Sequence, residues 1–270
     1  MTFMEKIRQA WVKNNSLVCV GLDPDIKKLP ACLKGAKYPV FEFNKALIDA
    51  TADLVCSYKP QCAYYAGQDV EAELKMTMSY LQETHPEIPV ILDAKRGDIG
   101  PTAEMYAKEA FVIFNADAVT VNPYMGLDTL KPFMDYADRG TVILCRTSNP
   151  SSRELQELLC NGMPVYEHVA KLAQEKWNYN RNILLVVGAT FPEELGKVRS
   201  ICPDIPFLVP GVGAQGGDVQ KVVENGLAAD GLGLIINSSR GIIYADSSAE
   251  FAAGARQAAI ELRDLINQFR

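Results

Sequence analysis

Histidine is nearly absent from this chain of 270 residues, which has only two. His85 lies in a Thr-His-Pro-Glu connection and His168 lies inside a helical pattern, so neither follows a predicted strand. A histidine general base and a metal site of several histidines are therefore unsupported. Cys-x-x-Cys spacing is also missing among the seven cysteines, and scattered thiols of this kind are typical of a reduced, cytoplasmic protein.

A surplus of positive charge and a long apolar run are missing as well. The 27 Lys and Arg residues face 33 Asp and Glu residues, which gives a formal net charge of −6. A protein that binds nucleic acid or an anionic membrane surface needs a basic face, so we expect neither partner. No apolar run approaches the roughly 18–20 residues that span a bilayer, and residues 1–13 lack the apolar core of a signal peptide.

Apolar strand patterns and amphipathic helix patterns instead alternate along the whole chain. After a helix predicted at 2–13, strands are predicted at 17–22, 57–63, 89–93, 118–122, 141–145, 183–187, 206–210 and 231–236. Helices are predicted at 38–55, 71–83, 102–114, 127–136, 164–177, from 192 onward, 218–225 and 247–269.

This rhythm of about eight strand–helix units predicts an α/β fold, the (β/α)₈ or TIM barrel. We expect it to occupy residues 1–270 as a single domain with an extra N-terminal helix. An open doubly wound sheet is the alternative, although it more often has about five or six strands. The polar insertion at 151–162 has no assigned role: lid, dimer contact and plain loop all stay open.

Polar residues follow the predicted strands, and barrel enzymes place their active sites at that rim. These residues are Asp23, Lys59, Asp93, Lys95, Asp98, Asn122, Ser148, Gln215 and Arg240. Because strand side chains alternate, Asp93 and Lys95 are predicted to face the same way, and Gly97 lets the chain turn before Asp98. A lysine between two carboxylates at the end of a buried strand is typical of a perturbed catalytic group. A structural ion pair that closes the strand is the alternative.

The last two strand–loop junctions have the composition of a phosphate site. The glycines at 211–217 offer backbone N–H groups ahead of a helix, and Ser238, Ser239 and Arg240 add hydroxyls and a guanidinium. These glycines can also be simple turn residues. The Gly-x-Gly-x-x-Gly spacing from residue 211 also matches a nicotinamide-binding pattern. That interpretation is disfavoured because the pattern falls in the seventh unit and follows Pro210.

Three motifs together resemble the orotidine 5′-phosphate decarboxylase family, in its longer bacterial (type 2) form. They are Asp-x-Lys-x-x-Asp at 93–98, Pro-Gly-Val-Gly-Ala-Gln-Gly-Gly at 210–217 and Ser-Arg-Gly at 239–241. The resemblance begins at Cys-Val-Gly-Leu-Asp, 19–23, and so covers nearly the whole barrel. It implies a carboxy-lyase that converts orotidine 5′-phosphate to UMP and CO₂, the last step of de novo pyrimidine synthesis. It also implies that no metal and no organic cofactor is needed.

The resemblance further implies a role for each residue that carries chemistry. Lys95 would protonate C6 of the pyrimidine, with Asp93 beside the substrate carboxylate. Asp23 and Lys59 would hold the ribose hydroxyls.

Other implied roles concern the partner subunit and the two ends of the substrate. Asp98 and Thr102 would reach into the site of a neighbouring subunit, which makes the enzyme a homodimer with shared active sites. Ser148 would bind the pyrimidine edge, Gln215 would bridge pyrimidine and phosphate, and Arg240 would bind the phosphate. The remaining phosphate-loop residues are Gly213, Gly216 and Ser239.

Two other functions stay open on the sequence alone. A Mg²⁺-dependent sugar-phosphate decarboxylase or aldolase of the same superfamily shares the Asp-x-Lys-x-x-Asp pattern, but it needs acidic metal ligands at the strand ends. Asp23 and Asp93 suit that role, whereas Lys59 is a poor neighbour for a metal. A phosphate-ligand binding protein without turnover is the second alternative.

Overall fold

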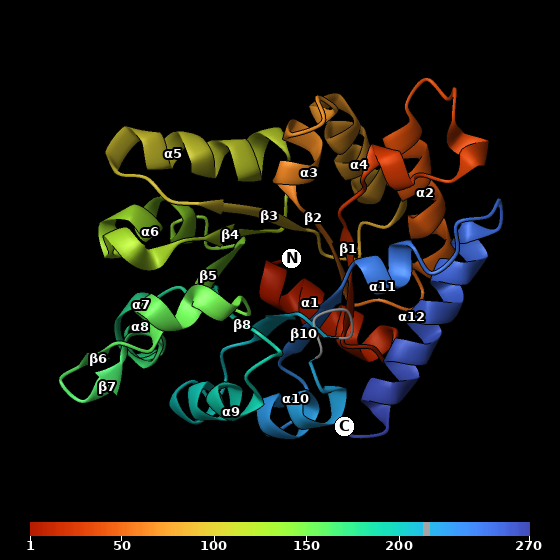
Figure 1. Ribbon diagram of the computed structural model, residues 1–270. Helices are drawn as coiled ribbons and strands as arrows, with labels where there is room; N and C mark the ends of the chain where they lie inside the picture. Colours follow the sequence, from red (N-terminus) through yellow and green to blue (C-terminus); the bar gives the residue numbers. More distant parts are fainter. Residues whose placement is uncertain (213–216) are drawn as a thin grey trace.

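The computed structural model describes residues 1–212 and 217–270, and its centre is a closed barrel of parallel strands (Figure 1). The strand order is β2-β1-β10-β9-β8-β5-β4-β3. Parallel bridges from Tyr58 to Val90 and from Gln61 to Asp93 join the two end strands and close the sheet. The predicted TIM barrel is confirmed, and the open sheet is wrong. The strands are β1 (Val18–Leu22), β2 (Ser57–Pro60), β3 (Ile91–Arg96), β4 (Ala118–Val121), β5 (Gly140–Arg146), β8 (Ile183–Val187), β9 (Phe207–Pro210) and β10 (Leu234–Ser238).

Helices cover the outside of this barrel (Figure 1). They are α1 (Phe3–Lys13), α2 (Pro39–Thr51), α3 (Cys62–Ala66), α4 (Glu71–Thr84), α5 (Gly100–Lys108), α6 (Leu127–Met134), α7 (Arg153–Gln156), α8 (Val165–Leu172), α9 (Pro192–Ile201), α10 (Val219–Gly226), α11 (Arg240–Ile243) and α12 (Phe251–Asn267). Among the residues described, no helix is both long enough and apolar enough to cross a membrane.

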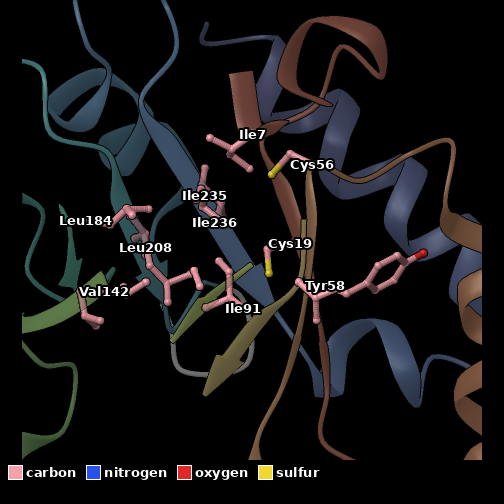
Figure 2. Close-up of a cluster of buried hydrophobic side chains, with 14 of the residues drawn as sticks. Ile7, Cys19, Cys56, Tyr58, Ile91, Val142, Leu184, Leu208, Ile235 and Ile236 are labelled. Carbon is pink, nitrogen blue, oxygen red and sulfur yellow. The ribbon is translucent and has the colours of Figure 1, made fainter. Parts of the chain in front are cut away.

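Helix α1 lies against the amino-terminal end of the barrel. It begins with a capping box in which Thr2 and Glu5 satisfy each other's backbone N–H groups. Its buried face includes Phe3 and Ile7, and a Cβ added at Gly140 would lie 2.8 Å from the Phe3 ring. Figure 2 shows Ile7 beside the apolar side chains of β10, so α1 extends the barrel core.

Two element boundaries differ from the sequence prediction at places that matter for the site. The second strand ends at Pro60, and a short helix, α3, follows where strand was predicted to 63. The third strand continues past the predicted end at Asp93 to Arg96, because the Arg96 carbonyl still accepts the Asn122 N–H at 2.8 Å. Lys95 and Arg96 therefore belong to the sheet itself.

The insertion after β5 has structure of its own. It contains α7 and a short hairpin of β6 (Leu159–Cys160) and β7 (Met163–Pro164). Asn161 and Gly162 both have positive φ angles, of 52° and 80°, which is the backbone of a tight two-residue hairpin turn. In Figure 1 the hairpin projects away from the barrel.

Candidate active site

A cavity of about 560 Å³ opens at the carboxyl ends of the strands. Side chains at the ends of seven of the eight barrel strands reach it, which is the usual construction of a site on this fold. Its charged and hydroxyl lining includes Asp23, Lys59, Asp93, Lys95, Ser148, Ser239 and Arg240. Six of the nine residues predicted for this rim line the cavity, namely Asp23, Lys59, Asp93, Lys95, Ser148 and Arg240, whereas Asp98 and Asn122 do not.

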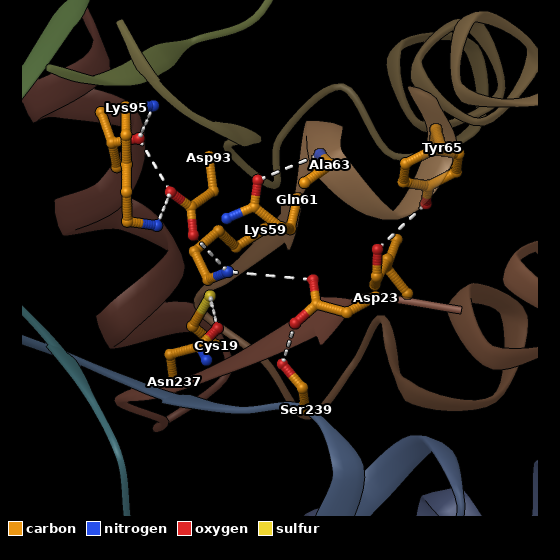
Figure 3. Close-up of polar contacts among 12 residues, drawn as sticks. Cys19, Asp23, Lys59, Gln61, Ala63, Tyr65, Asp93, Lys95, Asn237 and Ser239 are labelled. Carbon is orange, nitrogen blue, oxygen red and sulfur yellow. Dashed lines mark hydrogen bonds and ion pairs between the residues drawn. The ribbon is translucent and has the colours of Figure 1, made fainter. Parts of the chain in front are cut away.

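Lys59, Asp93 and Lys95 form a row of alternating charges across the cavity floor (Figure 3). The Lys59 ammonium donates to Asp93 Oδ2 at 3.0 Å, and the Lys95 ammonium donates to Asp93 Oδ1 at 2.7 Å. Lys59 and Asp93 are buried, whereas the Lys95 side chain is 47% exposed. Lys95 is therefore the member of the row that a bound molecule can reach.

The row keeps its buried groups ionised. Burial alone would raise the pKa of Asp93, but the ammonium groups of Lys59 and Lys95 hold it well below its usual range. Burial alone would lower the pKa of Lys59, but the carboxylates of Asp23 and Asp93 raise it well above its usual range. Both groups are therefore charged at neutral pH.

Thr120 of β4 holds two members of this row and was missed by the sequence analysis. Its hydroxyl accepts the Lys95 backbone N–H at 2.9 Å and donates to Asp93 Oδ1 at 2.8 Å. Lys95 has a φ of +46°, a left-handed conformation that costs a residue with a Cβ, and the register of β3 shifts between Leu92 and Arg96. The Thr120 hydroxyl thus stabilises the bulge that turns Lys95 toward Asp93.

Replacing Thr120 by valine is expected to lower kcat/KM by about 10–100-fold, since small misplacements of reacting groups have effects of this size. Thr120→Ser keeps the hydroxyl and should restore most of the activity. Thr141→Val is a matched control, because the Thr141 hydroxyl is also buried in the barrel but has no hydrogen-bond partner among the described residues. Steady-state kinetics on the three variants makes the comparison. Equal activities of Thr120→Val and Thr141→Val would contradict the role of Thr120.

Asp23 lies on the other side of Lys59 and borders the cavity. Its Oδ2 accepts the Ser239 hydroxyl at 2.7 Å, while its buried Oδ1 has no hydrogen-bond partner among the described residues and lies 3.9 Å from Lys59 Nζ. Ser239 approaches closely because Gly21 has no side chain: a Cβ there would lie 1.8 Å from the Ser239 hydroxyl oxygen. The Asp23 side chain borders the cavity, so a ligand hydroxyl that enters beside Lys59 can donate to its carboxylate.

Ser148 lies in the loop after β5 at one wall of the cavity. Gly188 allows this position, since a Cβ there would come within 2.9 Å of the Ser148 backbone. Arg240 begins α11, next to Ser239, and also borders the cavity. Gly213, Gln215 and Gly216, predicted to contact phosphate and pyrimidine, lie outside the described residues.

Asp98 and Thr102 do not reach the cavity of their own chain. Asp98 is half-buried and accepts the N–H of Ile99 at 2.8 Å, and within residues 1–212 and 217–270 it forms no ion pair with Lys95. Thr102 is exposed on α5. The predicted lysine between two carboxylates of one chain is therefore Lys59, which lies between Asp23 and Asp93, rather than Lys95.

No group of three or more His, Cys, Asp or Glu side chains in the described part of the chain is arranged to bind a metal ion. Asp23 and Asp93 are the two carboxylates that border the cavity among the described residues. The ammonium of Lys59 stands between these two carboxylates. The Lys59 ammonium thus already supplies a positive charge to both carboxylates.

Comparisons with known proteins agree with this geometry. Residues 16–255 match the family model described as orotidine 5′-phosphate decarboxylase / HUMPS family. The chain is 58% identical over 270 residues to an orotidine 5′-phosphate decarboxylase of Dechloromonas aromatica, with 100% of both chains covered. The structure is similar to that of Leishmania donovani OMP decarboxylase, with a TM-score of 0.86, 40% identity, and coverage of 100% and 98%. It also matches 56% of the longer Leishmania donovani UMP synthase chain, with a TM-score of 0.88 and 42% identity over all of this chain.

Proposed function

This chain belongs to the orotidine 5′-phosphate decarboxylase family and converts orotidine 5′-phosphate to UMP and CO₂, and we propose that Lys95 delivers the proton that replaces the carboxylate. The observation that carries this proposal is the position of the Lys95 ammonium. It lies 2.7 Å from a buried carboxylate, on the exposed side of the charge row, and it borders the cavity. The Lys59 ammonium is buried, so it is less able than Lys95 to transfer a proton to a substrate.

The chemistry requires a fixed positive charge at this place. Loss of CO₂ from C6 of the pyrimidine leaves an electron pair on carbon, with no adjacent carbonyl to accept it. An ammonium held beside C6 stabilises that charge as it develops and then gives it a proton. Asp93 holds the Lys95 ammonium in place, and Thr120 and Lys59 hold Asp93. The protein therefore organises the site before substrate binds.

The two ends of the cavity suit the rest of the substrate. We propose that the carboxylate of Asp23, together with Lys59, binds the ribose hydroxyls, since both side chains border the cavity. Arg240 would bind the phosphate together with the backbone of Ser239, whose hydroxyl donates to Asp23, and Ser148 would bind the pyrimidine edge. Binding energy from the phosphate end, which is remote from C6, can then contribute to the chemical step.

We also propose that two copies of the chain share their sites, with Asp98 and Thr102 reaching the partner's cavity. The supporting observation is the apolar surface around Asp98: Ile99, Met105 and Tyr124 are 60%, 63% and 80% exposed. A hollow of about 590 Å³ is lined by residues of α5 and α6, among them Met105 and Gly100. Large apolar side chains gathered in this way are typical of a protein–protein interface. The seven unpaired cysteines support a cytoplasmic location for this dimer.

Release of CO₂ from orotidine 5′-phosphate in the presence of EDTA tests the proposed mechanism. We expect the same rate with and without the chelator, because Lys59 occupies the position between Asp23 and Asp93. A rate that falls with EDTA and returns with Mg²⁺ would favour the metal-dependent alternative instead. Tight UMP binding without any release of CO₂ would indicate a binding protein.

A further inference from the structure

Arg146, the last residue of β5, is a fully buried cation that the reaction does not use. Its guanidinium donates to Ser152 Oγ and to Glu157 Oε1, each at 2.5 Å, and its central carbon lies 3.8 Å from the centroid of the Phe191 ring. Burying a charge is costly unless it is paired and hydrogen-bonded. Both acceptors belong to the insertion after β5, so the buried charge holds that insertion against the barrel.

Gln156, at the end of α7, connects the insertion to the cavity wall. Its amide oxygen accepts the Thr147 N–H at 2.9 Å, and its amide nitrogen donates to the Thr147 hydroxyl at 2.8 Å. Arg146 also lies 3.4 Å from the same amide oxygen. Both ends of one side-chain amide are therefore committed to Thr147, which itself lines the cavity.

The loop that Gln156 holds is the one that carries Ser148. The Thr147 hydroxyl donates onward to Asn149 Oδ1 at 2.8 Å, so hydrogen bonds lie on both sides of Ser148. From the other direction, Thr190 donates to the Ser148 carbonyl at 3.2 Å. Thr147, Ser148 and Asn149 all border the cavity.

We propose that the insertion is a positioning element for the pyrimidine end of the substrate, with Gln156 as the positioning residue and Arg146 as its anchor. The proposal rests on the proposed role of Ser148 in binding the pyrimidine edge. Gln156 does not touch the substrate. It fixes the backbone and hydroxyl of Thr147, and the preorganised loop then presents Ser148 at the distance the pyrimidine needs.

The test compares Gln156→Ala with Gln257→Ala, which removes an equally long amide on helix α12 whose side-chain bond, among the described contacts, is to Glu261. We expect Gln156→Ala to lower kcat/KM by about 10–100-fold and to weaken UMP binding, because small displacements of positioned groups have effects of that size. Ribose 5-phosphate, which has no base, should bind with unchanged affinity. Gln257→Ala should change none of these quantities.

Two further variants distinguish a failure of the positioning role of Gln156 from a failure of the premise that Ser148 binds the pyrimidine edge. Gln156→Glu keeps an acceptor for the Thr147 N–H and should recover most of the lost activity, which also serves if Gln156→Ala does not fold. Equal kinetics for Gln156→Ala and Gln257→Ala, or an equal loss of affinity for UMP and ribose 5-phosphate, would overturn the proposal. Ser148→Ala tests the premise separately: unchanged UMP affinity there would overturn the role of Ser148, and the positioning role with it.

Discussion

Lys95→Ala is expected to lower kcat/KM for orotidine 5′-phosphate by about 10⁴-fold or more. The variant loses both the proton donor and the positive charge next to C6, and each kind of contribution is typically worth a factor of about 10²–10⁴. The fold should survive, because Lys95 is half-exposed and Asp93 keeps its bonds to Lys59 and Thr120. Steady-state release of CO₂ measures the loss, and thermal unfolding checks the fold.

Two measurements show whether this loss is specific to the chemical step. Lys45→Ala is the matched control, since Lys45 pairs with Asp49 on the surface of α2. Its activity should equal that of the parent. Titration with UMP should give Lys95→Ala an affinity within about tenfold of the parent, since the phosphate and ribose contacts remain. If Lys95→Ala retained a tenth or more of the parent kcat/KM, Lys95 would not be the proton donor.

The fold could be predicted because its signals are local and repeated. Each apolar run followed by an amphipathic helix predicts one strand–helix unit, and closure of the sheet follows from the number of units. The prediction of a common rim needs only that parallel strands end on the same side. Asp23, Lys59, Asp93 and Arg240 therefore meet at one cavity although they are far apart in the sequence.

The contacts that set the geometry of the site could not be predicted in this way. Alternation along an ordinary strand places Asp93 and Lys95 on one face, but their 2.7 Å contact depends on the bulge at Lys95 and on Thr120 from the next strand. Nothing in the local pattern distinguishes Thr120 from any other threonine of a buried strand. The partners of Gln156 are likewise set by how α7 packs on the barrel, which is a tertiary property.

Asp98→Ala is expected to lower kcat/KM by about 10²–10³-fold, the usual effect of removing one electrostatic group from an active site. This effect requires the partner subunit, because within one chain Asp98 bonds only to the N–H of Ile99 among the described contacts. Asp98→Asn is the matched variant, since it keeps the side-chain shape and the acceptor oxygen for that N–H. We expect Asp98→Asn to be nearly as impaired as Asp98→Ala, because the missing charge is what matters.

The most direct test of a shared active site is the activity of a mixed dimer. Lys95→Ala and Asp98→Ala chains with different tags are co-expressed, and the heterodimer is purified through both tags. If Asp98 acts across the interface, one of the two sites has an intact Lys95 and an intact Asp98, and the heterodimer should show about half the parent activity. If each Asp98 acts within its own chain, neither site is intact. An activity no higher than that of the Asp98→Ala dimer would then contradict the shared site.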